Sequence, residues 1–384
     1  MMPSSAIHKP PAATPTLVIS IDGLNASFLG PYGNTWFPTP CFNRLAAQSL
    51  MLEAAFTHEL DPASFLYQTW SQWRHQLPEM GIALASDSDP VLNADWPGDW
   101  VPANLDVSVR ASRIASRLER THAARVAQKS LAWLADQPSG GVNWLHWSGL
   151  VGPWDAPREL RAALCDEDGP DSTDWTCAED ASAALSTAEE IDDWRFQLQT
   201  TYAAQVQCWD YALALVMDEL QPRLASHELQ LVVLAPRGFC VGTHGSCGDF
   251  ESLWDEVWQV PVFIVQGEQV AATRSQRLSS LSELGLVLAE TQMPASLWRD
   301  DSWLCCRNRI DVPGPERLAI QSQSTQAIKT REWTLRCPRR GGPELYVRPD
   351  DRFQVNDVAD RVPEVVVELQ QSVRQELGGE ATDS

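Results

Sequence analysis

The sequence has little positive charge, and it contains no long apolar run. Its 384 residues include 29 Lys and Arg against 51 Asp and Glu, which gives a formal net charge of −22. Such a chain repels nucleic-acid phosphates and anionic membrane surfaces, so we expect neither nucleic acid nor a membrane as a partner. Residues 1–16 contain no apolar segment long enough for a signal peptide, and no later stretch approaches the ~18–20 apolar residues of a spanning helix. We therefore expect a cytoplasmic protein.

The sequence also lacks paired cysteine motifs. Its nine cysteines form no CxxC pair and are scattered over positions 41, 165, 177, 208, 240, 247, 305, 306 and 337. An odd, scattered set is typical neither of a disulfide framework nor of a zinc site. We expect reduced thiols that are mostly buried.

Short apolar runs alternate with amphipathic segments along most of the chain. The apolar runs predict buried strands at 16–23, 141–147, 229–236 and 260–265. The amphipathic segments predict helices at 39–50, 113–137 and 195–220. This alternation favours an α/β fold with a mostly parallel sheet that is covered by helices on both faces.

The organisation changes toward both ends of the chain. Pro-rich residues 1–15 indicate a disordered leader, and residues 299–384 contain the short segments and final helix of a smaller C-terminal α+β subdomain. Residues 16–298 form the α/β domain between them. Within that domain, residues 165–193 carry eleven acidic residues and little apolar periodicity, so we interpret them as a solvated insertion.

Four segments occur in an order that resembles a known family. The first, residues 17–57, contains the Asp22-Gly23 turn, GPYGN at 30–34 and TPCFNRLA at 39–46. The others are the segment 201–220 with Tyr202 and Asp210, GTHGSCGDFESLWDEVWQVPVFI at 242–264, and AIKTREWTLRC at 327–337 with PELY at 343–346. Together they resemble the sulfatase family of the alkaline phosphatase superfamily over nearly the whole chain. The resemblance implies an alkaline-phosphatase-like fold.

The resemblance also implies a chemistry. Such sulfatases use a formylglycine nucleophile, made from the Cys or Ser of a Cys/Ser-x-Pro-x-Arg motif. They hold a divalent cation, usually calcium, with an Asp-Asp pair and a later Asp-His or Asp-Asn pair. A sulfate or phosphate ester gathers negative charge on its oxygens in the transition state, so a metal and basic side chains must converge on it.

The nucleophile motif of the family is absent from this sequence. The segment after Thr57 reads HELDPASF, and aligning Pro62 with the motif proline places Leu60 at the nucleophile position and Ser64 at the Arg position. Leucine cannot become formylglycine. Thr57 is the fallback nucleophile, because related phosphodiesterases use a threonine; the alternative is that Thr57, Ser64 and Thr69 are all structural.

The metal ligands of the family are also reduced. Asp22-Gly23 retains one carboxylate, and Asp22 could equally be a turn or cap residue. The second pair reads Pro236-Arg237, and neither proline nor a guanidinium can bind calcium. A buried Asp22 without its cation would be an unpaired charge. We therefore predict that the guanidinium of Arg237 takes the place of the metal and pairs with Asp22.

Two further positions depart from the family or are ambiguous. Asp249 stands where the motif has an anion-binding lysine, which reverses the charge. His244 is kept in the same loop, either as part of a remnant pocket with Asp22, Arg237 and Asp249 or as a residue that only satisfies loop backbone. His146, in a Trp-flanked strand, is interpreted as a core histidine.

The sequence therefore predicts a sulfatase-family pseudoenzyme with a binding, scaffolding or regulatory role. The alternative is an active hydrolase of sulfate or phosphate esters that uses another nucleophile, such as Thr57. We expect no cofactor, or calcium if the ancestral site survives in part. The partner is an unknown protein or small molecule.

Overall fold

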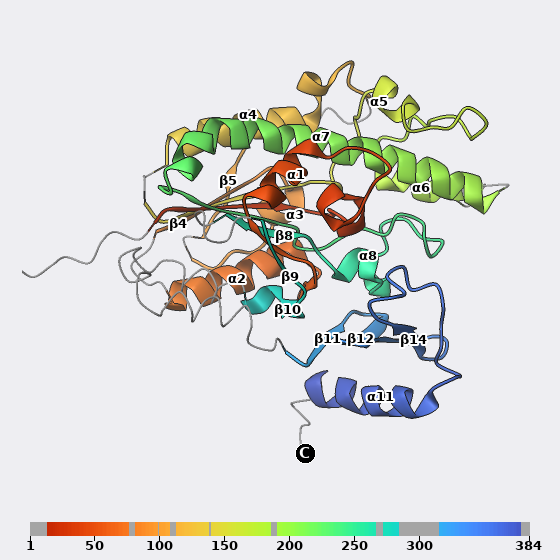
Figure 1. Cartoon of the computed structure of the whole chain (residues 1–384). Helices are drawn as coiled ribbons and strands as arrows, with labels where there is room; N and C mark the ends of the chain where they lie inside the picture. Colours follow the sequence, from red (N-terminus) through yellow and green to blue (C-terminus); the bar gives the residue numbers. More distant parts are fainter. Residues whose placement is uncertain are drawn as a thin grey trace, which may run out of the picture.

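A large, mostly parallel sheet forms the centre of the molecule (Figure 1). The computed structural model describes residues 14–76, 81–98, 100–107, 113–137, 140–185, 190–265, 272–283 and 315–377. Eight strands form the sheet in the order β5-β4-β6-β1-β7-β8-β2-β9. They are β1 (Thr16–Ile21), β2 (Leu50–Leu52), β4 (Ile82–Ser86), β5 (Ala103–Asn104), β6 (Val142–Trp147), β7 (Gln230–Leu234), β8 (Val262–Val265) and β9 (Thr273–Ser275). Only β8 runs antiparallel to its neighbours, β7 and β2.

The central strands are buried on both faces, which is why their sequences are continuous apolar runs. Every residue of β1 and of β7 is buried. Trp144 and Trp147 of β6 show the two faces directly, because side chains three apart on a strand point to opposite sides. Trp144 stacks on Trp73, whereas Trp147 stacks on Trp209. The four predicted strands are confirmed.

Helices cover both faces of the sheet, as predicted. The helices α1 (Pro40–Ala47), α4 (His122–Ala135) and α7 (Ile191–Ala225) lie on one side of the sheet, and α2 (Pro62–Gln76) lies on the other (Figure 1). Trp73 lies on α2 and Trp209 on α7, so each tryptophan of β6 packs against a different layer.

The predicted helix at 113–137 is too long. It begins only at His122, because the side chain of Thr121 accepts a hydrogen bond from the backbone N–H of Ala124 and so caps the first turn. Before this cap, residues Leu118–Arg120 form a single 3-10 turn, and Arg117 is extended. The capping threonine fixes the position of His122, which matters for the site described below.

A second, antiparallel sheet follows near the C-terminus. Its strands are β11 (Arg317–Gln321), β12 (Thr325–Thr330), β13 (Trp333–Pro338) and β14 (Glu344–Val347), paired in chain order. The helix α11 (Pro363–Leu377) buries Val366, Leu369 and Val373 against Ile328 and Leu335 of this sheet. The small pair β3 (Ala55–Phe56) and β10 (Ser279–Ser280) lies near it, and Phe56 and Trp258 pack with Ala327. The antiparallel sheet is thus packed on both sides.

The acidic segment predicted as an insertion contains the helix α6 (Ala178–Leu185) and the first residues of α7. The buried side chain of Arg161, on α5 (Arg158–Ala162), donates hydrogen bonds to four backbone carbonyls. Two belong to the loop before α5 and two to the acidic segment: Trp154 O, Ala156 O, Thr173 O and Trp175 O. The first part of the acidic segment is therefore tied to the body of the α/β domain.

Four predictions concern parts of the chain that the structure describes only partly or not at all. Residues 1–13 of the predicted leader and the predicted boundary at 298/299 lie outside the described residues. The seven cysteines inside the described ranges are free thiols. Within those ranges, no helix is both long and apolar enough to cross a membrane.

Candidate functional site

Four strands of the large sheet end in polar residues at the same edge. Asp22 follows β1, Asp87 follows β4, Ser148 follows β6, and Pro236-Arg237 lies just beyond β7. The carboxyl ends of parallel strands are where α/β folds place their ligands. The turn after β6 lies very close to the end of β1: a Cβ added at Gly149 would lie only 2.1 Å from Asp22 O. Gly149 has a φ of +58°, so this close approach requires glycine.

Asp22 and Arg237 meet at this edge in a two-pronged ion pair. Arg237 Nε lies 2.9 Å from Asp22 Oδ1, and Arg237 Nη2 lies 3.0 Å from Asp22 Oδ2. The side chains are 3 % and 12 % exposed for Asp22 and Arg237, respectively. Arg237 Nη1 donates to Leu60 O at 2.9 Å, and the guanidinium carbon lies 3.8 Å from the centre of the Phe250 ring. The ion pair predicted from the sequence is confirmed.

These residues do not fit a calcium ion. Both carboxylate oxygens of Asp22 already accept hydrogen bonds from a guanidinium, which carries the charge that a cation would bring. Pro236 offers no side-chain ligand. Within the described ranges, no group of three or more His, Cys, Asp or Glu side chains could hold a metal ion.

The loop at the predicted nucleophile position caps α2. Thr57 is buried, and its hydroxyl donates to Glu59 O at 2.8 Å. Glu59 Oε1 in turn accepts hydrogen bonds from the backbone N–H groups of Leu60 and Asp61, just before α2 begins. The Leu60 side chain packs against the apolar cluster around Phe56, and only its carbonyl reaches Arg237.

Ser64 contributes to this cap through its backbone N–H rather than its hydroxyl. The N–H donates to Asp61 Oδ1 at 2.7 Å. Sequence reasoning passed over the neighbouring His58. Both of its ring nitrogens are buried without a hydrogen-bond partner, and burial lowers its pKa.

His244 and Asp249 do not join the Asp22–Arg237 pair. His244 stacks on Trp254 with ring centres 3.5 Å apart and an angle of 10° between the planes. Burial, with a smaller contribution from Arg336, lowers the pKa of His244 to about 4. The guanidinium of Arg336 lies 3.2 Å from the centre of the same indole, so Trp254 is held between an imidazole and a guanidinium. Asp249 is exposed and accepts a hydrogen bond from the backbone N–H of Glu251.

A second buried polar cluster lies at the same sheet edge, and sequence reasoning missed it. Asp87 Oδ2 lies 2.7 Å from His122 Nε2 and 2.6 Å from Ser148 Oγ, and Asp87 Oδ1 accepts the backbone N–H of Ser148 at 2.8 Å. Burial raises the pKa of Asp87, but the hydrogen bonds from His122 and Ser148 outweigh it and hold that pKa below its ordinary value. His122 Nδ1 is buried and has no hydrogen-bond partner among the residues that the structure describes. The cluster joins β4, β6 and the start of α4.

His146 lies inside the sheet rather than in a cavity. Its Nδ1 is 2.9 Å from Ser20 Oγ on the neighbouring strand β1, and Ser20 Oγ also accepts a hydrogen bond from Trp144 Nε1. The other ring nitrogen of His146 is buried without a partner, and burial lowers the pKa of this histidine. These contacts are those of a core histidine.

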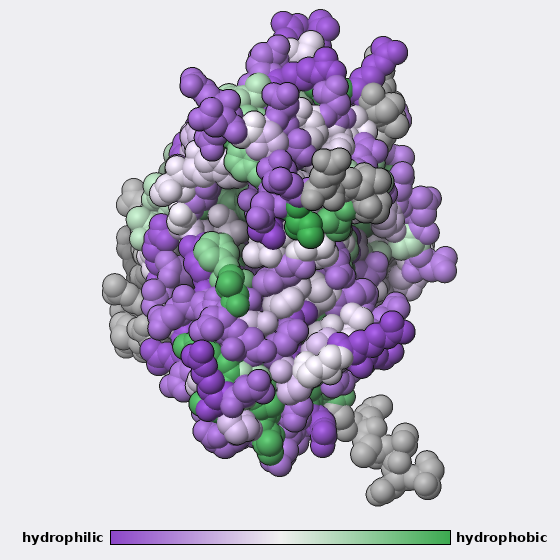
Figure 2. Space-filling view, turned by 90° about the vertical axis from the view of Figure 1, so that its right-hand side faces the viewer, coloured by the Kyte–Doolittle hydropathy of each residue, from purple (hydrophilic) through white to green (hydrophobic). Residues whose placement is uncertain are grey.

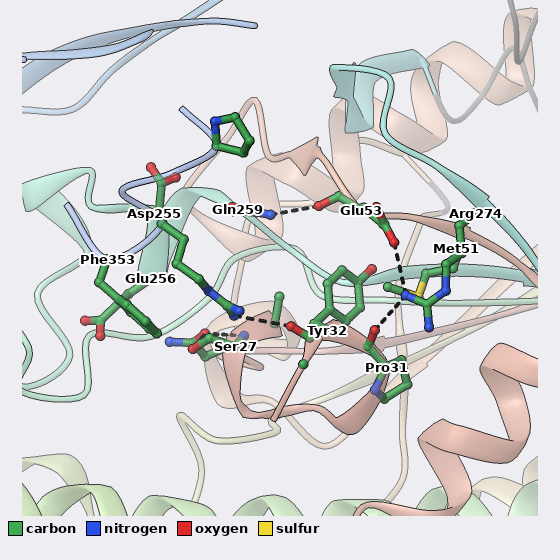
Figure 3. A pocket seen from close by; sticks show the side chains of 15 residues that line it. Ser27, Pro31, Tyr32, Met51, Glu53, Asp255, Glu256, Gln259, Arg274 and Phe353 are labelled. Atoms are coloured by element: carbon green, nitrogen blue, oxygen red, sulfur yellow. Dashed lines mark hydrogen bonds and ion pairs between the residues drawn. The ribbon is translucent and has the colours of Figure 1, made fainter. Parts of the chain in front are cut away.

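A pocket of about 420 Å³ lies beside this edge, between the large sheet and the loop that follows β14. We call it the interdomain pocket. Figure 3 shows Glu53 and Arg274 on one side of Tyr32, and Glu256 and Phe353 on the other. Its lining consists of Asn25, Ala26, Ser27, Pro31, Tyr32, Gly33, Met51, Glu53, Asp255, Glu256, Gln259, Arg274, Pro349, Arg352 and Phe353. Neither Asp22 nor Arg237 is part of that lining.

The surface around the pocket is mostly polar. Figure 2 shows a largely hydrophilic face with separate, small hydrophobic patches. Phe353 at the pocket is 50 % exposed and is one of the few large apolar side chains open to solvent in the described ranges. No broad apolar patch marks this face as a protein interface.

Comparisons with known proteins place the fold. No protein-family model matches the sequence, and no curated protein matches it significantly. Solved structures do match. The phosphonate monoester hydrolase of Agrobacterium radiobacter aligns with a TM-score of 0.62 and 15% identity, over 94% of this chain and 96% of that chain. The chain has the fold of this hydrolase.

Two further structures support this assignment. The phosphonate monoester hydrolase SpPMH from Silicibacter pomeroyi has a TM-score of 0.66 and 13% identity, with 95% of each chain covered. A 2-O GAG sulfatase has a TM-score of 0.63 and 13% identity, over 97% of this chain and 93% of that one. The alkaline-phosphatase-like fold expected from the sequence is therefore confirmed. Structural similarity at such low sequence identity establishes the fold alone. Any statement about activity must rest on the residues of the site.

Proposed function

We propose that this chain is a sulfatase-fold protein that has lost sulfuric ester hydrolase activity and acts by binding a partner or a small molecule. The observation that carries the proposal is the ion pair between Asp22 and Arg237. The guanidinium donates to both carboxylate oxygens and to Leu60 O, so its charge and hydrogen bonds are used within the protein.

Ester hydrolysis of this kind needs an activated nucleophile and positive charge aimed at the leaving and non-bridging oxygens. Leu60 supplies no nucleophile. The hydroxyl of Thr57 is directed to Glu59 O, and no side-chain base contacts it within the described ranges. Asp249 places a negative charge where an anion-binding lysine would be expected. Each of these features opposes the hydrolysis of a sulfate or phosphate ester at this edge.

The test is a hydrolysis assay on the full chain. We would compare 4-nitrophenyl sulfate, 4-nitrophenyl phosphate and a 4-nitrophenyl phosphonate monoester, each with added calcium and with chelator. The expected result is release of nitrophenol at the rate of buffer alone under all conditions. Circular dichroism of each sample confirms that the protein is folded.

Variants separate this proposal from the alternative of an active enzyme that uses Thr57. Thr57→Ala removes the hydroxyl, and Thr57→Ser retains it as the matched control. Turnover in the wild type and in Thr57→Ser that disappears in Thr57→Ala would establish the alternative. Turnover that requires calcium would also contradict the proposal.

A further inference from the structure

The interdomain pocket contains charged groups of both signs, and most of them are already paired. Glu53 Oε1 lies 3.0 Å from Arg274 Nη1, and this nitrogen also donates to Pro31 O at 2.9 Å. Asp255 pairs with the buried Lys329. The pocket's carboxylates are thus largely committed to partners within the protein.

Glu256 is the third carboxylate of the lining. It accepts hydrogen bonds from the backbone N–H of Val241, at 3.2 Å, and from the hydroxyl of Thr243. Burial raises the pKa of Glu256 to about 7, so its carboxyl carries only part of a negative charge at neutral pH. It repels an anion in the pocket less than an exposed glutamate would.

Arg352 is the exception among the charged side chains of the lining. Within the described ranges no carboxylate lies within 4.0 Å of its guanidinium. Its Nη2 donates to Tyr32 O at 3.2 Å, and the guanidinium carbon lies 5.0 Å from the centre of the Phe353 ring. In the part of the chain that the structure describes, Nε and Nη1 have no hydrogen-bond partner.

The guanidinium has a defined position over the loop that follows β1. A Cβ at Gly33 would lie 3.3 Å from Arg352 Nη1, so the glycine leaves room for this nitrogen. Gly33 has a φ of +99°, a conformation that side chains rarely adopt. The arginine is therefore placed at the pocket by Gly33 and by the carbonyl of Tyr32.

From these observations we infer that the interdomain pocket binds a small organic oxyanion, a carboxylate or a phosphate ester, through Arg352. A guanidinium matches the oxygens of either group through the fork of Nε and Nη2 or through that of Nη1 and Nη2, and Tyr32 O takes only one of the two hydrogens of Nη2. The volume of about 420 Å³ is that of a small-molecule site, and Tyr32, Met51 and Phe353 offer apolar surface to the body of the ligand. This inference rests on the proposed binding role and specifies the ligand class.

The test is calorimetric titration of the full chain with matched pairs of probes. Glycerol 3-phosphate is compared with glycerol, and succinate with succinamide, so that each oxyanion has a neutral counterpart. We expect saturable binding of at least one oxyanion and of neither neutral probe. Comparing the two oxyanions distinguishes a phosphate site from a carboxylate site.

Variants of the pocket decide whether Arg352 is responsible. Arg352→Ala should weaken the binding of the oxyanion roughly tenfold or more, because it removes a charge-assisted contact. Arg361→Ala changes an exposed arginine outside the pocket and should leave binding unchanged. Arg352→Lys keeps the charge without the planar fork and should give an intermediate affinity.

Three results would overturn the inference. The first is the absence of saturable binding by both oxyanions. The second is equal binding by wild type and Arg352→Ala, and the third is an equal loss of binding in Arg352→Ala and Arg361→Ala. Glycerol released from glycerol 3-phosphate is measured in the same samples: its release would contradict the proposed loss of hydrolysis, while the binding inference would stand.

Discussion

Arg237 and Arg352 occupy two neighbouring regions of the molecule and are used in opposite ways. At the sheet edge, Arg237 gives its hydrogen bonds to Asp22 and Leu60 and is nearly buried. At the interdomain pocket, Arg352 is exposed and, among the described residues, donates only to Tyr32 O. A guanidinium can either stabilise a fold through internal contacts or bind a ligand. Arg237, at the sheet edge, does the first, and Arg352, at the pocket, is available for the second.

The largest effect is expected at the sheet edge. Arg237→Ala leaves the carboxylate of Asp22 buried and unpaired, which should lower the free energy of unfolding by about 3–5 kcal/mol. Urea denaturation followed by tryptophan fluorescence measures the change.

The matched control removes both charges. Asp22→Asn combined with Arg237→Met should recover much of the loss, since the cost lies in the orphaned carboxylate. If the effects of the two single substitutions merely add, the pair does not stabilise the fold in this way. Arg237 would then not differ from Arg352 in stabilising the fold through an ion pair.

The buried cluster at Asp87 provides the next effect. Asp87→Asn keeps the shape of the side chain but removes the negative charge that His122 and Ser148 contact. We expect a loss of about 1.5–3 kcal/mol in the free energy of unfolding, the range for hydrogen bonds to a charged group. Ser148→Ala is the milder control. A loss for Asp87→Asn no larger than that for Ser148→Ala would show that the charge contributes little.

A smaller effect concerns pH. The folded protein holds the pKa of His244 at about 4, below the ordinary 6.5, so between these values the unfolded chain binds more protons. Stability should therefore rise as the pH increases from 4 to 6.5, and it should fall again on acidification. His244→Phe keeps a ring against Trp254 and should flatten this part of the profile. Thermal unfolding midpoints of wild type and variant across this pH range provide the measurement.

The smallest effect is expected at the pocket. Arg352→Ala should change the free energy of unfolding by less than ~0.5 kcal/mol, because the side chain is exposed and forms no ion pair in the described ranges. Urea denaturation of Arg352→Ala and Arg237→Ala under the same conditions compares their free energies of unfolding directly. A loss comparable to that of Arg237→Ala would mean that Arg352 is a structural residue.

The fold and one contact of the site could be predicted from the sequence. Apolar runs in the sequence predict buried strands, and residues that follow neighbouring parallel strands lie at the same edge of the sheet. The pairing of Asp22 with Arg237, over 215 positions, could be predicted because the family resemblance gives both as former metal-ligand positions on neighbouring strands, and because a lone buried charge is costly.

The Asp87 cluster could not be found in this way. His122 lies at the start of a helix that the sequence pattern began nine residues too early, at 113 instead of 122. The capping hydrogen bond from the backbone N–H of Ala124 to the Thr121 hydroxyl marks that boundary, and hydrophobic periodicity does not report it. The interdomain pocket is harder still, because its lining comes from five separate stretches of chain, around residues 25–33, 51–53, 255–259, 274 and 349–353.

Arg161 has a consequence for how the molecule opens. Its guanidinium is solvated by carbonyls from two segments, at 154–156 and 173–175, in place of water. Pulling either segment away would strip a buried cation of half its hydrogen bonds, so the two segments should unfold locally as one unit. Amide protons in both should then exchange with solvent at a common rate, and a protease should cut the acidic segment only as often as the loop at 154–156 also opens.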